Sequence, residues 1–173
     1  MDIEQNGLYF VSGIKEIILS VGGQFNDFKE RPVVALLPSI NDPNFFWAVP
    51  VGDLGHRDDE KIKRIQMYLN FPQKDIRSCF YHIGNTNKKS IFFISDVFPI
   101  TSDYVSRKYL VFDEKHYIIK NQQLLNDLDG KLRRVLAYEQ SKIKQNGRFF
   151  FRQNIFGAYA KIKAVSENEI TEP

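Results

Sequence analysis

The 173-residue sequence contains a single cysteine, Cys79. A lone cysteine excludes an internal disulfide and any zinc site built from several cysteines, and it is typical of a chain kept in a reducing cytoplasm. The three histidines, at positions 56, 82 and 116, do not have the spacing of metal ligands. We therefore expect a cytoplasmic protein that uses no metal and no cofactor.

Several familiar catalytic signatures are also missing. The sequence has no P-loop, no glycine fingerprint of a dinucleotide site, no nucleophile elbow and no helix with two zinc-binding histidines. Its apolar runs are too short to span a bilayer, and the acidic start Met1-Asp2-Ile3-Glu4 lacks the pattern of a signal peptide. Nothing in the sequence therefore predicts a membrane partner.

The chain is rich in aromatic residues, with 15 Phe and 8 Tyr, and 43% of its residues are hydrophobic. A chain of this length and composition can bury a core of its own, so we expect one domain over residues 1–164. The polar, acidic tail over residues 165–173 is expected to fray. The net charge of +3 permits a nucleic-acid partner without requiring one.

Hydrophobic patterning predicts two antiparallel hairpins. The aliphatic run 32–37 is followed by turn-forming residues and then by the apolar run 45–51. The second hairpin joins 78–83 to 91–94 through a polar turn. Shorter strands are expected at residues 8–11, 96–100 and 117–119.

Helical spacing of apolar residues predicts three helices between and after these strands. The first covers 13–20 with Ser12 as its cap, the second covers about 58–69, and the longest covers about 121–143 with Gly130 inside it. Residues 149–163 fit either a strand or a helix. The order of elements is not a βαβ series, so we predict an α+β fold. We expect a small, strongly curved antiparallel sheet or barrel with inserted helices and a helical C-terminal third.

The loop that follows the strand at 45–51 carries the most suggestive chemistry. Asp53, His56 and Arg57 lie within five positions, and loops held by a rigid sheet often carry catalytic groups. We predict that His56 acts as general acid or base, that Arg57 contacts a phosphate, and that Asp53 orients a neighbouring cation or histidine. The alternative is that Asp58 and Asp59 simply begin a helix and His56 is exposed without a role.

Basic, amide and aromatic residues in other segments could hold RNA through its phosphates and unstacked bases. The alternative is that they form ordinary core and solvated surface. The predicted RNA-binding set is Lys29, Lys61, Lys63, Arg64, Tyr81, His82, Asn85, Lys88, Lys89 and Arg152.

A series of segments occurs in a characteristic order. It comprises Leu8-Tyr9-Phe10-Val11-Ser12, Arg31-Pro32-Val33-Val34, Trp47-Ala48-Val49-Pro50-Val51, the hydrophobic stretch 91–100 that ends in Pro99-Ile100, and then a long helix. Over roughly residues 7–145 this order resembles the toxins of type III toxin–antitoxin systems, the ToxN/AbiQ/CptN group. The Arg-Pro-Val-Val segment also looks like the opening of the MazF/PemK-type ribonucleases.

This resemblance implies an SH3-related core and metal-independent cleavage of RNA, in which a ribose 2′-hydroxyl attacks the adjacent phosphate. It further implies a small structured RNA antitoxin in the active groove, an RNA-bridged homo-oligomer, and a role in abortive infection and phage defence. Arg31 is carried over from the Arg-Pro match as a contact to the scissile phosphate.

The sequence departs from the family pattern at one point. Where the family places a Thr-Ser or Ser-Ser pair, this chain has Gly52 and Asp53. Either the site is rebuilt around His56 and Arg57, or the chain cleaves differently or not at all. The predicted function is a sequence-preferring endoribonuclease toxin. The alternatives are a non-catalytic RNA- or protein-binding module and a type II toxin held by a protein antitoxin.

Overall fold

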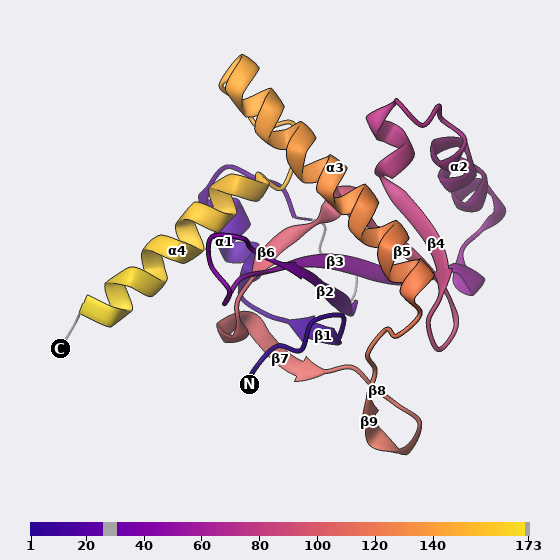
Figure 1. The fold of residues 1–173 in the computed structure, drawn as a ribbon, viewed down its shortest axis with the longest axis horizontal. Helices are drawn as coiled ribbons and strands as arrows, with labels where there is room; N and C mark the ends of the chain where they lie inside the picture. Colours follow the sequence, from indigo (N-terminus) through magenta and orange to yellow (C-terminus); the bar gives the residue numbers. More distant parts are fainter. Residues whose placement is uncertain (26–30, 172–173) are drawn as a thin grey trace.

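The computed structural model describes residues 1–25 and 31–171 (Figure 1). Its centre is an antiparallel sheet of seven strands in the order β4-β5-β3-β2-β1-β7, with β6 paired to β3. The sheet does not close into a barrel, so the predicted α+β class with an antiparallel sheet is confirmed in its open form. The strands are β1 (Leu8–Val11), β2 (Val33–Pro38), β3 (Phe46–Asp53), β4 (Tyr81–Asn85), β5 (Lys89–Phe93), β6 (Phe98–Ile100) and β7 (Val105–Lys108).

Strand β3 joins the two predicted hairpins into one sheet. Its first half pairs with β2, with Val49 opposite Val34, and its last residues pair with β5, with Val51 opposite Phe92. A strand buried on both faces reads as a continuous apolar run, and β2 and β3 have that composition. Because the last residues of β3 pair with β5, the loop after Asp53 lies beside the hairpin of β4 and β5.

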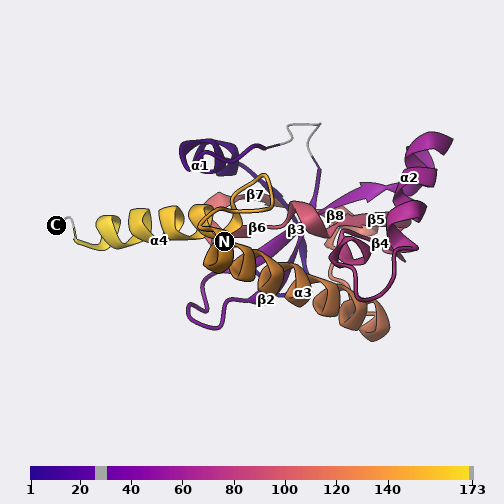
Figure 2. The same cartoon turned by 90° about the horizontal axis from the view of Figure 1, so that it is seen from above.

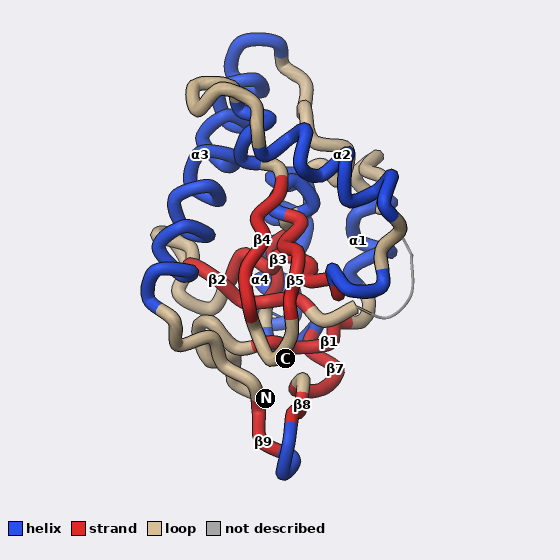
Figure 3. Tube along the Cα trace, turned by 90° about the vertical axis from the view of Figure 1, so that its right-hand side faces the viewer, coloured by secondary structure: helices blue, strands red, loops and turns tan. Residues whose placement is uncertain are grey.

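Four helices cover the sheet: α1 (Ile14–Ser20), α2 (Asp59–Leu69), α3 (Gln122–Asn146) and α4 (Ile155–Thr171). Helices α1 and α3 lie on opposite sides of the sheet (Figure 2). The arm formed by β8 (Leu110–Val111) and β9 (Lys115–His116) projects away from it (Figure 3). Among the described residues, no helix combines the length and the hydropathy that crossing a bilayer requires.

Alternating residues of the strands supply the two main cores. Val34 and Leu36 pack with Leu128 and Leu132 of α3 on one face. On the other face lie the alternate residues of β2, Val33 and Ala35. They pack with Ile14 and Ile18 of α1 and with Ala158 and Ile162 of α4. A third, smaller core joins Leu54 and Ile65 of the α2 region to Ile91 and Phe93 of β5. The β4–β5 hairpin therefore has α3 on one face and α2 on the other.

The predicted helix starts are right at two sites and wrong at one. Asp58 caps α2 by accepting a hydrogen bond from Lys61 N, and Asn121 caps α3 by accepting one from Leu124 N. Ser12 does not cap α1. That role falls to Gly13, whose φ of 79° is accessible to glycine without strain, because the chain must turn sharply after β1.

Three other segments differ from their predictions. Residues 78 and 79 belong to a short 3₁₀ turn, Ile76–Cys79, so β4 begins only at Tyr81. The segment 149–163, for which the sequence fits either a strand or a helix, consists of a turn followed by α4. Helix α4 continues to Thr171, although a frayed tail was expected from residue 165. Gly130 does not interrupt α3, because the buried Leu128 and Leu132 on either side of it anchor that stretch of helix.

Candidate functional site

Strand β3 ends in an acid that contacts both a histidine and a lysine. Asp53 accepts a hydrogen bond of 2.8 Å from Gly55 N, which fixes the 3₁₀ turn Leu54–His56. Its Oδ2 lies 3.3 Å from His56 Nε2 and 3.3 Å from Lys88 Nζ. The Gly55 hydrogen bond, followed by Lys88 and His56, holds the pKa of Asp53 below its ordinary value. The His56 side chain is 87% exposed, so this turn presents an oriented imidazole to solvent.

Two arginines from different segments meet on the ring of Phe93. The guanidinium carbon of Arg57 lies 4.8 Å from the ring centroid, and that of Arg31 lies 5.2 Å from it. Within the described parts of the chain, neither arginine has a carboxylate within 4.0 Å. Burial, followed by the positive charge of Arg31, lowers the pKa of Arg57. Arg57 nevertheless stays charged, because a guanidinium is not deprotonated in proteins.

The Nε atom of Arg57 is buried and has no hydrogen-bond partner. Leaving a buried charged donor unpaired costs about 1–3 kcal/mol or more. The protein thus keeps two like charges together, partly removed from water, and among the described residues Asp53 and Asp58 act on Arg57 only from beyond ion-pair distance. An anion bound at this point would supply both the charge and the missing acceptor.

Gly52 explains how Arg57 reaches this position. A Cβ atom at Gly52 would lie only 2.6 Å from Arg57 Nη2 and 2.9 Å from Cε2 of Phe93. The glycine therefore lets the guanidinium lie against the backbone of β3. The resemblance predicts a residue with a hydroxyl group at this position. The glycine found here has no side chain, and the guanidinium of Arg57 occupies that space.

Tyr81 completes the group around Phe93. Its ring packs edge-on against Phe93, with 5.9 Å between centroids, and against Tyr68 of α2 at 5.4 Å. Burial, first of all, raises the pKa of Tyr81, and Asp96 acts in the same direction. The raised pKa keeps the phenol protonated at neutral pH.

Two further arginines lie close enough to Tyr81 to act on its charge. Arg64 of α2 and Arg152 each oppose the rise in its pKa. Arg152 also donates a 3.0 Å hydrogen bond to Asp96. We call Arg31, Arg57, Arg64 and Arg152 the arginine cluster: Arg31 and Arg57 share the Phe93 ring, whereas Arg64 and Arg152 act on Tyr81 and Arg152 is already ion-paired to Asp96. Its members come from four separate segments of the chain.

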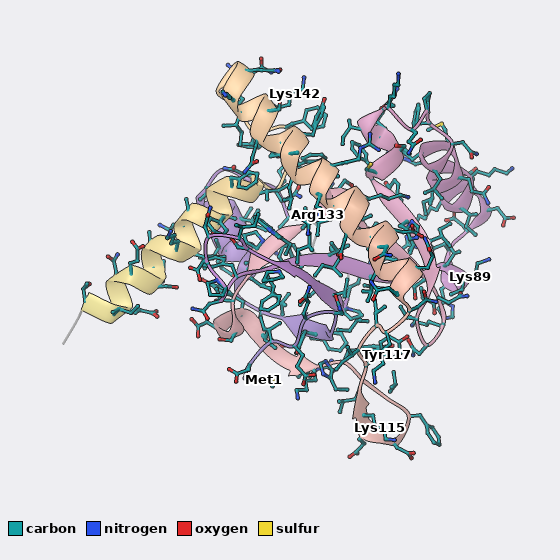
Figure 4. All side chains as sticks on the ribbon, in the orientation of Figure 1. Met1, Lys89, Lys115, Tyr117, Arg133 and Lys142 are labelled. Atoms are coloured by element: carbon teal, nitrogen blue, oxygen red, sulfur yellow. The ribbon has the colours of Figure 1, made fainter. Side chains whose placement is uncertain are left out.

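The remaining residues of the predicted RNA-binding set are scattered. Lys61 lies 3.9 Å from Asp58 in the first turn of α2, and Lys63 is exposed on the same helix. Asn85 and Lys89 face each other across the exposed end of the β4–β5 hairpin, where Figure 4 shows Lys89 at the edge of the molecule. Lys29 lies outside the described residues.

His82, also predicted to bind RNA, lies apart from Tyr81. His82 follows Tyr81 in β4, so its side chain lies on the opposite face, beneath α3. Its Nε2 is 3.8 Å from Asp127 of α3, and only 17% of the side chain is exposed. The sequence contained the signal that separates the two residues, because adjacent residues of a strand alternate between its faces.

Sequence reasoning missed Phe93 and Gly52, which position the two central arginines. Phe93 reads as one more apolar residue of a core strand, and Gly52 reads as a turn residue. Neither pattern indicates that a charged side chain packs on it. Only the pairing of β3 with β5, which places Gly52 opposite Ile91, brings the two residues together.

In the part of the chain that the structure describes, no three His, Cys, Asp or Glu side chains gather as metal ligands would. Comparison of the chain with protein-family models and with curated proteins finds no match. What the site can do chemically follows from its own residues. They offer a pair of guanidinium groups for an anion, a phenol that holds its proton, and an exposed imidazole paired with a carboxylate.

Proposed function

We propose that this protein is an endoribonuclease that binds single-stranded RNA at the arginine cluster and cleaves it by attack of a ribose 2′-hydroxyl. One observation carries the proposal: Arg31 and Arg57 share the Phe93 ring, no carboxylate of residues 1–25 and 31–171 lies within 4.0 Å of either guanidinium, and Arg57 Nε has no acceptor among those residues. A phosphate diester supplies the charge and the acceptor together, and arginine binds it through paired hydrogen bonds.

The aromatic residues beside the arginines favour RNA over a small anion. Tyr68 and Tyr81 are only half-buried and lie next to the phosphate position. Unpaired bases stack on such rings, and each stacked base contributes about 1–3 kcal/mol. A strand held by its phosphate at Arg57 would bring its neighbouring bases onto them.

The proposed reaction divides proton transfer between two residues. His56, oriented by Asp53, takes the proton of the 2′-hydroxyl as the O2′–P bond forms. Arg31 and Arg57 neutralise the charge that develops on the non-bridging oxygens. Tyr81 gives its proton to the 5′-oxygen as the P–O5′ bond breaks. The products are a 2′,3′-cyclic phosphate and a 5′-hydroxyl; His56 then releases its proton to solvent, and solvent returns one to Tyr81.

We further propose that the enzyme acts as a toxin in a type III system, as the resemblance of its segments implies. A small structured RNA would then compete with substrate for the arginine cluster. The same RNA would bridge copies of the chain in the inhibited complex. The strong dependence of phosphate contacts on salt makes this competition measurable.

The test is cleavage of a labelled RNA by the purified chain, with the new ends identified by mass spectrometry. The wild type is expected to leave cyclic phosphate and 5′-hydroxyl ends. His56→Ala is expected to lower the rate by about 100-fold or more, because general base catalysis contributes at least that much. In cells, His56→Ala should abolish growth inhibition. Full activity of this variant would remove His56 from the mechanism.

A second candidate is a non-catalytic RNA-binding module. The observation that favours it is the 87% exposure of His56, whose partners are Asp53 and solvent. This alternative predicts RNA binding that depends on Arg57, together with an RNA that stays intact and a His56→Ala variant that binds like the wild type. The same assay separates the two candidates. A protein antitoxin that copurifies with the chain would instead favour a type II system.

A further inference from the structure

The second half of α3 and the loop that joins it to α4 are strongly basic. Residues 130–154 contain seven Lys and Arg side chains and a single acid, Glu139, whose side chain is fully buried. No carboxylate of the described chain pairs with Lys142 or Arg148 within 4.0 Å. Figure 4 shows Lys142 near the far end of α3. The seven basic residues are Lys131, Arg133, Arg134, Lys142, Lys144, Arg148 and Arg152.

The same loop exposes two aromatic rings. Phe149 is 38% exposed and Phe150 is 50% exposed. Together with Lys142, Asn146 and Arg148 they line an open depression of about 430 Å³. We call these five residues the Phe150 subsite. Such a combination offers stacking surfaces, an amide for a base edge, and cations for phosphates.

Buried contacts hold the loop rigidly in place. Glu139 accepts a 2.6 Å hydrogen bond from Phe150 N and a 2.9 Å hydrogen bond from Phe151 N. The Phe150 ring is further fixed edge-on against Tyr138, with 5.1 Å between centroids. An exposed aromatic side chain on a rigid backbone loses little conformational entropy when a ligand binds, so it is prepared for stacking.

The Phe150 subsite is connected directly to the arginine cluster. Phe150 and Arg152 are two residues apart, so their Cα atoms are at most about 7 Å apart. Between them Phe151 turns inward and packs edge-on against Phe80, which stacks on Tyr68 beside Tyr81. Phe150 and Arg152 are both exposed, so a member of the Phe150 subsite and a member of the arginine cluster reach solvent only two residues apart.

We infer that the Phe150 subsite binds unpaired bases of the same RNA strand whose phosphate is held at the arginine cluster. This inference rests on the proposed function and extends it, because it gives the enzyme a substrate several nucleotides long with one flank read by stacking. Charge selects RNA as the occupant. A second copy of this chain would bring the same basic residues to the contact, and the like charges would repel.

The experiment measures how affinity grows with RNA length. RNAs carrying a 2′-deoxy nucleotide at the scissile position cannot be cleaved, and they are extended by one and then two nucleotides on either side of a short core. For the wild type, extension on one side is expected to strengthen binding at least about 5-fold per base that stacks. Phe150→Ala should abolish this gain and keep the affinity for the core. A 2-aminopurine placed in the extension should be quenched by the wild type and not by Phe150→Ala.

Two controls keep the test decisive. Phe112→Ala removes another exposed ring, 87% exposed on the β8–β9 arm, and should keep the gain. Lys142→Gln and Arg148→Gln should leave binding of the core RNA unchanged. For the extended RNA, each should reduce the slope of log affinity against log salt concentration by about one. Lys163→Gln, exposed on α4, should not change it.

The outcomes separate the inference from the function on which it rests. If the core RNA binds but neither extension adds affinity, or if the Phe150, Lys142 and Arg148 variants keep the gain, the inference is wrong and the proposed function stands. If Phe150→Ala changes self-association and not RNA binding, the surface is a protein contact and the inference is likewise wrong. If the wild type does not bind the core and does not cleave the same RNA with a ribose at the scissile position, the proposed function fails and the inference falls with it.

Discussion

Two half-buried cations lie on opposite faces of the β4–β5 hairpin, and their surroundings differ. Lys131 of α3 donates a 2.9 Å hydrogen bond to the carbonyl of Tyr81, and Asp127 on the same helix supports its charge. Arg57 lies over Phe93 beside another arginine, and its Nε has no acceptor. Burial is the main cause that lowers the pKa of each. Lys131 is thus held by a hydrogen bond within the fold, whereas Arg57 has a donor that a ligand can use.

Replacing Arg57 should have the largest effect of all. We expect Arg57→Ala to lower kcat/KM for RNA cleavage by about 100-fold or more, because a preorganised cation at the phosphate stabilises charge that develops in the transition state. The free energy of unfolding should stay the same or rise, since an incompletely paired charge has been removed. Cleavage kinetics and urea unfolding of the same preparation test both statements.

Arg77 supplies the matched control for Arg57. Its guanidinium also lies on an aromatic ring, 3.8 Å from the centroid of Phe71, but it has a carboxylate partner, Asp75, at 2.7 Å. Arg77→Ala should leave cleavage unchanged. Equal losses in the two variants would mean that stacking on a ring, and not the absence of a counter-ion, decides the role.

Tyr81→Phe keeps the ring between Phe93 and Tyr68 and removes only the hydroxyl. We expect about 100-fold slower cleavage, because the 5′-oxygen loses its proton donor. An RNA with sulfur in place of that 5′-oxygen has a leaving group that needs no proton, so Tyr81→Phe should cleave it nearly as fast as the wild type does. His56→Ala should stay slow on both RNAs. A Tyr81→Phe variant that is equally slow on both would contradict proton donation, and Tyr68→Phe tests for a general effect of losing a phenol.

Lys131→Met probes the opposite face. The change leaves the Tyr81 carbonyl without its donor and should lower the free energy of unfolding by about 1–3 kcal/mol. Because Met is long and apolar, it fills the space of the lysine stem. The cleavage rate below the melting temperature should change by less than about threefold. A large loss of activity with normal stability would show that the two faces are not independent.

The smallest expected effect is the pH dependence of stability caused by His82. Burial is the first cause that lowers its pKa, Lys131 adds to the effect, and Asp127 opposes it. Below the ordinary histidine value of about 6.5, the unfolded chain binds a proton that the folded chain does not bind. The free energy of unfolding should therefore fall as the pH drops from about 7 towards 5. His82→Gln should flatten this fall in urea titrations, and identical slopes would contradict the assignment.

The sequence predicted most elements of this fold, because local patterns determine them. The hairpin of β2 and β3 and the long α3 follow from apolar spacing, and α2 follows from apolar spacing together with the acids Asp58 and Asp59 at its start. Whether the sheet closes depends on pairing between distant strands, and no local pattern reports it. The cap at Gly13 was missed because it depends on backbone geometry that Ser12 does not reveal.

The candidate site was predictable only in its local part. Asp53, His56 and Arg57 belong to one loop, and their proximity follows from their spacing. Arg64 and Arg152 were selected for their charge alone, and only the tertiary fold brings them to Tyr81. The same charge criterion selected Lys61, Lys63 and Lys89, which lie elsewhere, because charge patterning cannot distinguish a convergent group from a solvated surface.

The spread of the arginine cluster along the chain has a consequence for how the protein is made. A ribosome adds Arg31 early and Arg152 more than a hundred residues later. At about 5–20 residues per second, the two additions are separated by several seconds at least. Throughout that interval the nascent polypeptide lacks one of the four cations. The ribonuclease proposed above would thus leave the RNA-rich ribosome only after the last of its phosphate-binding cations had been added.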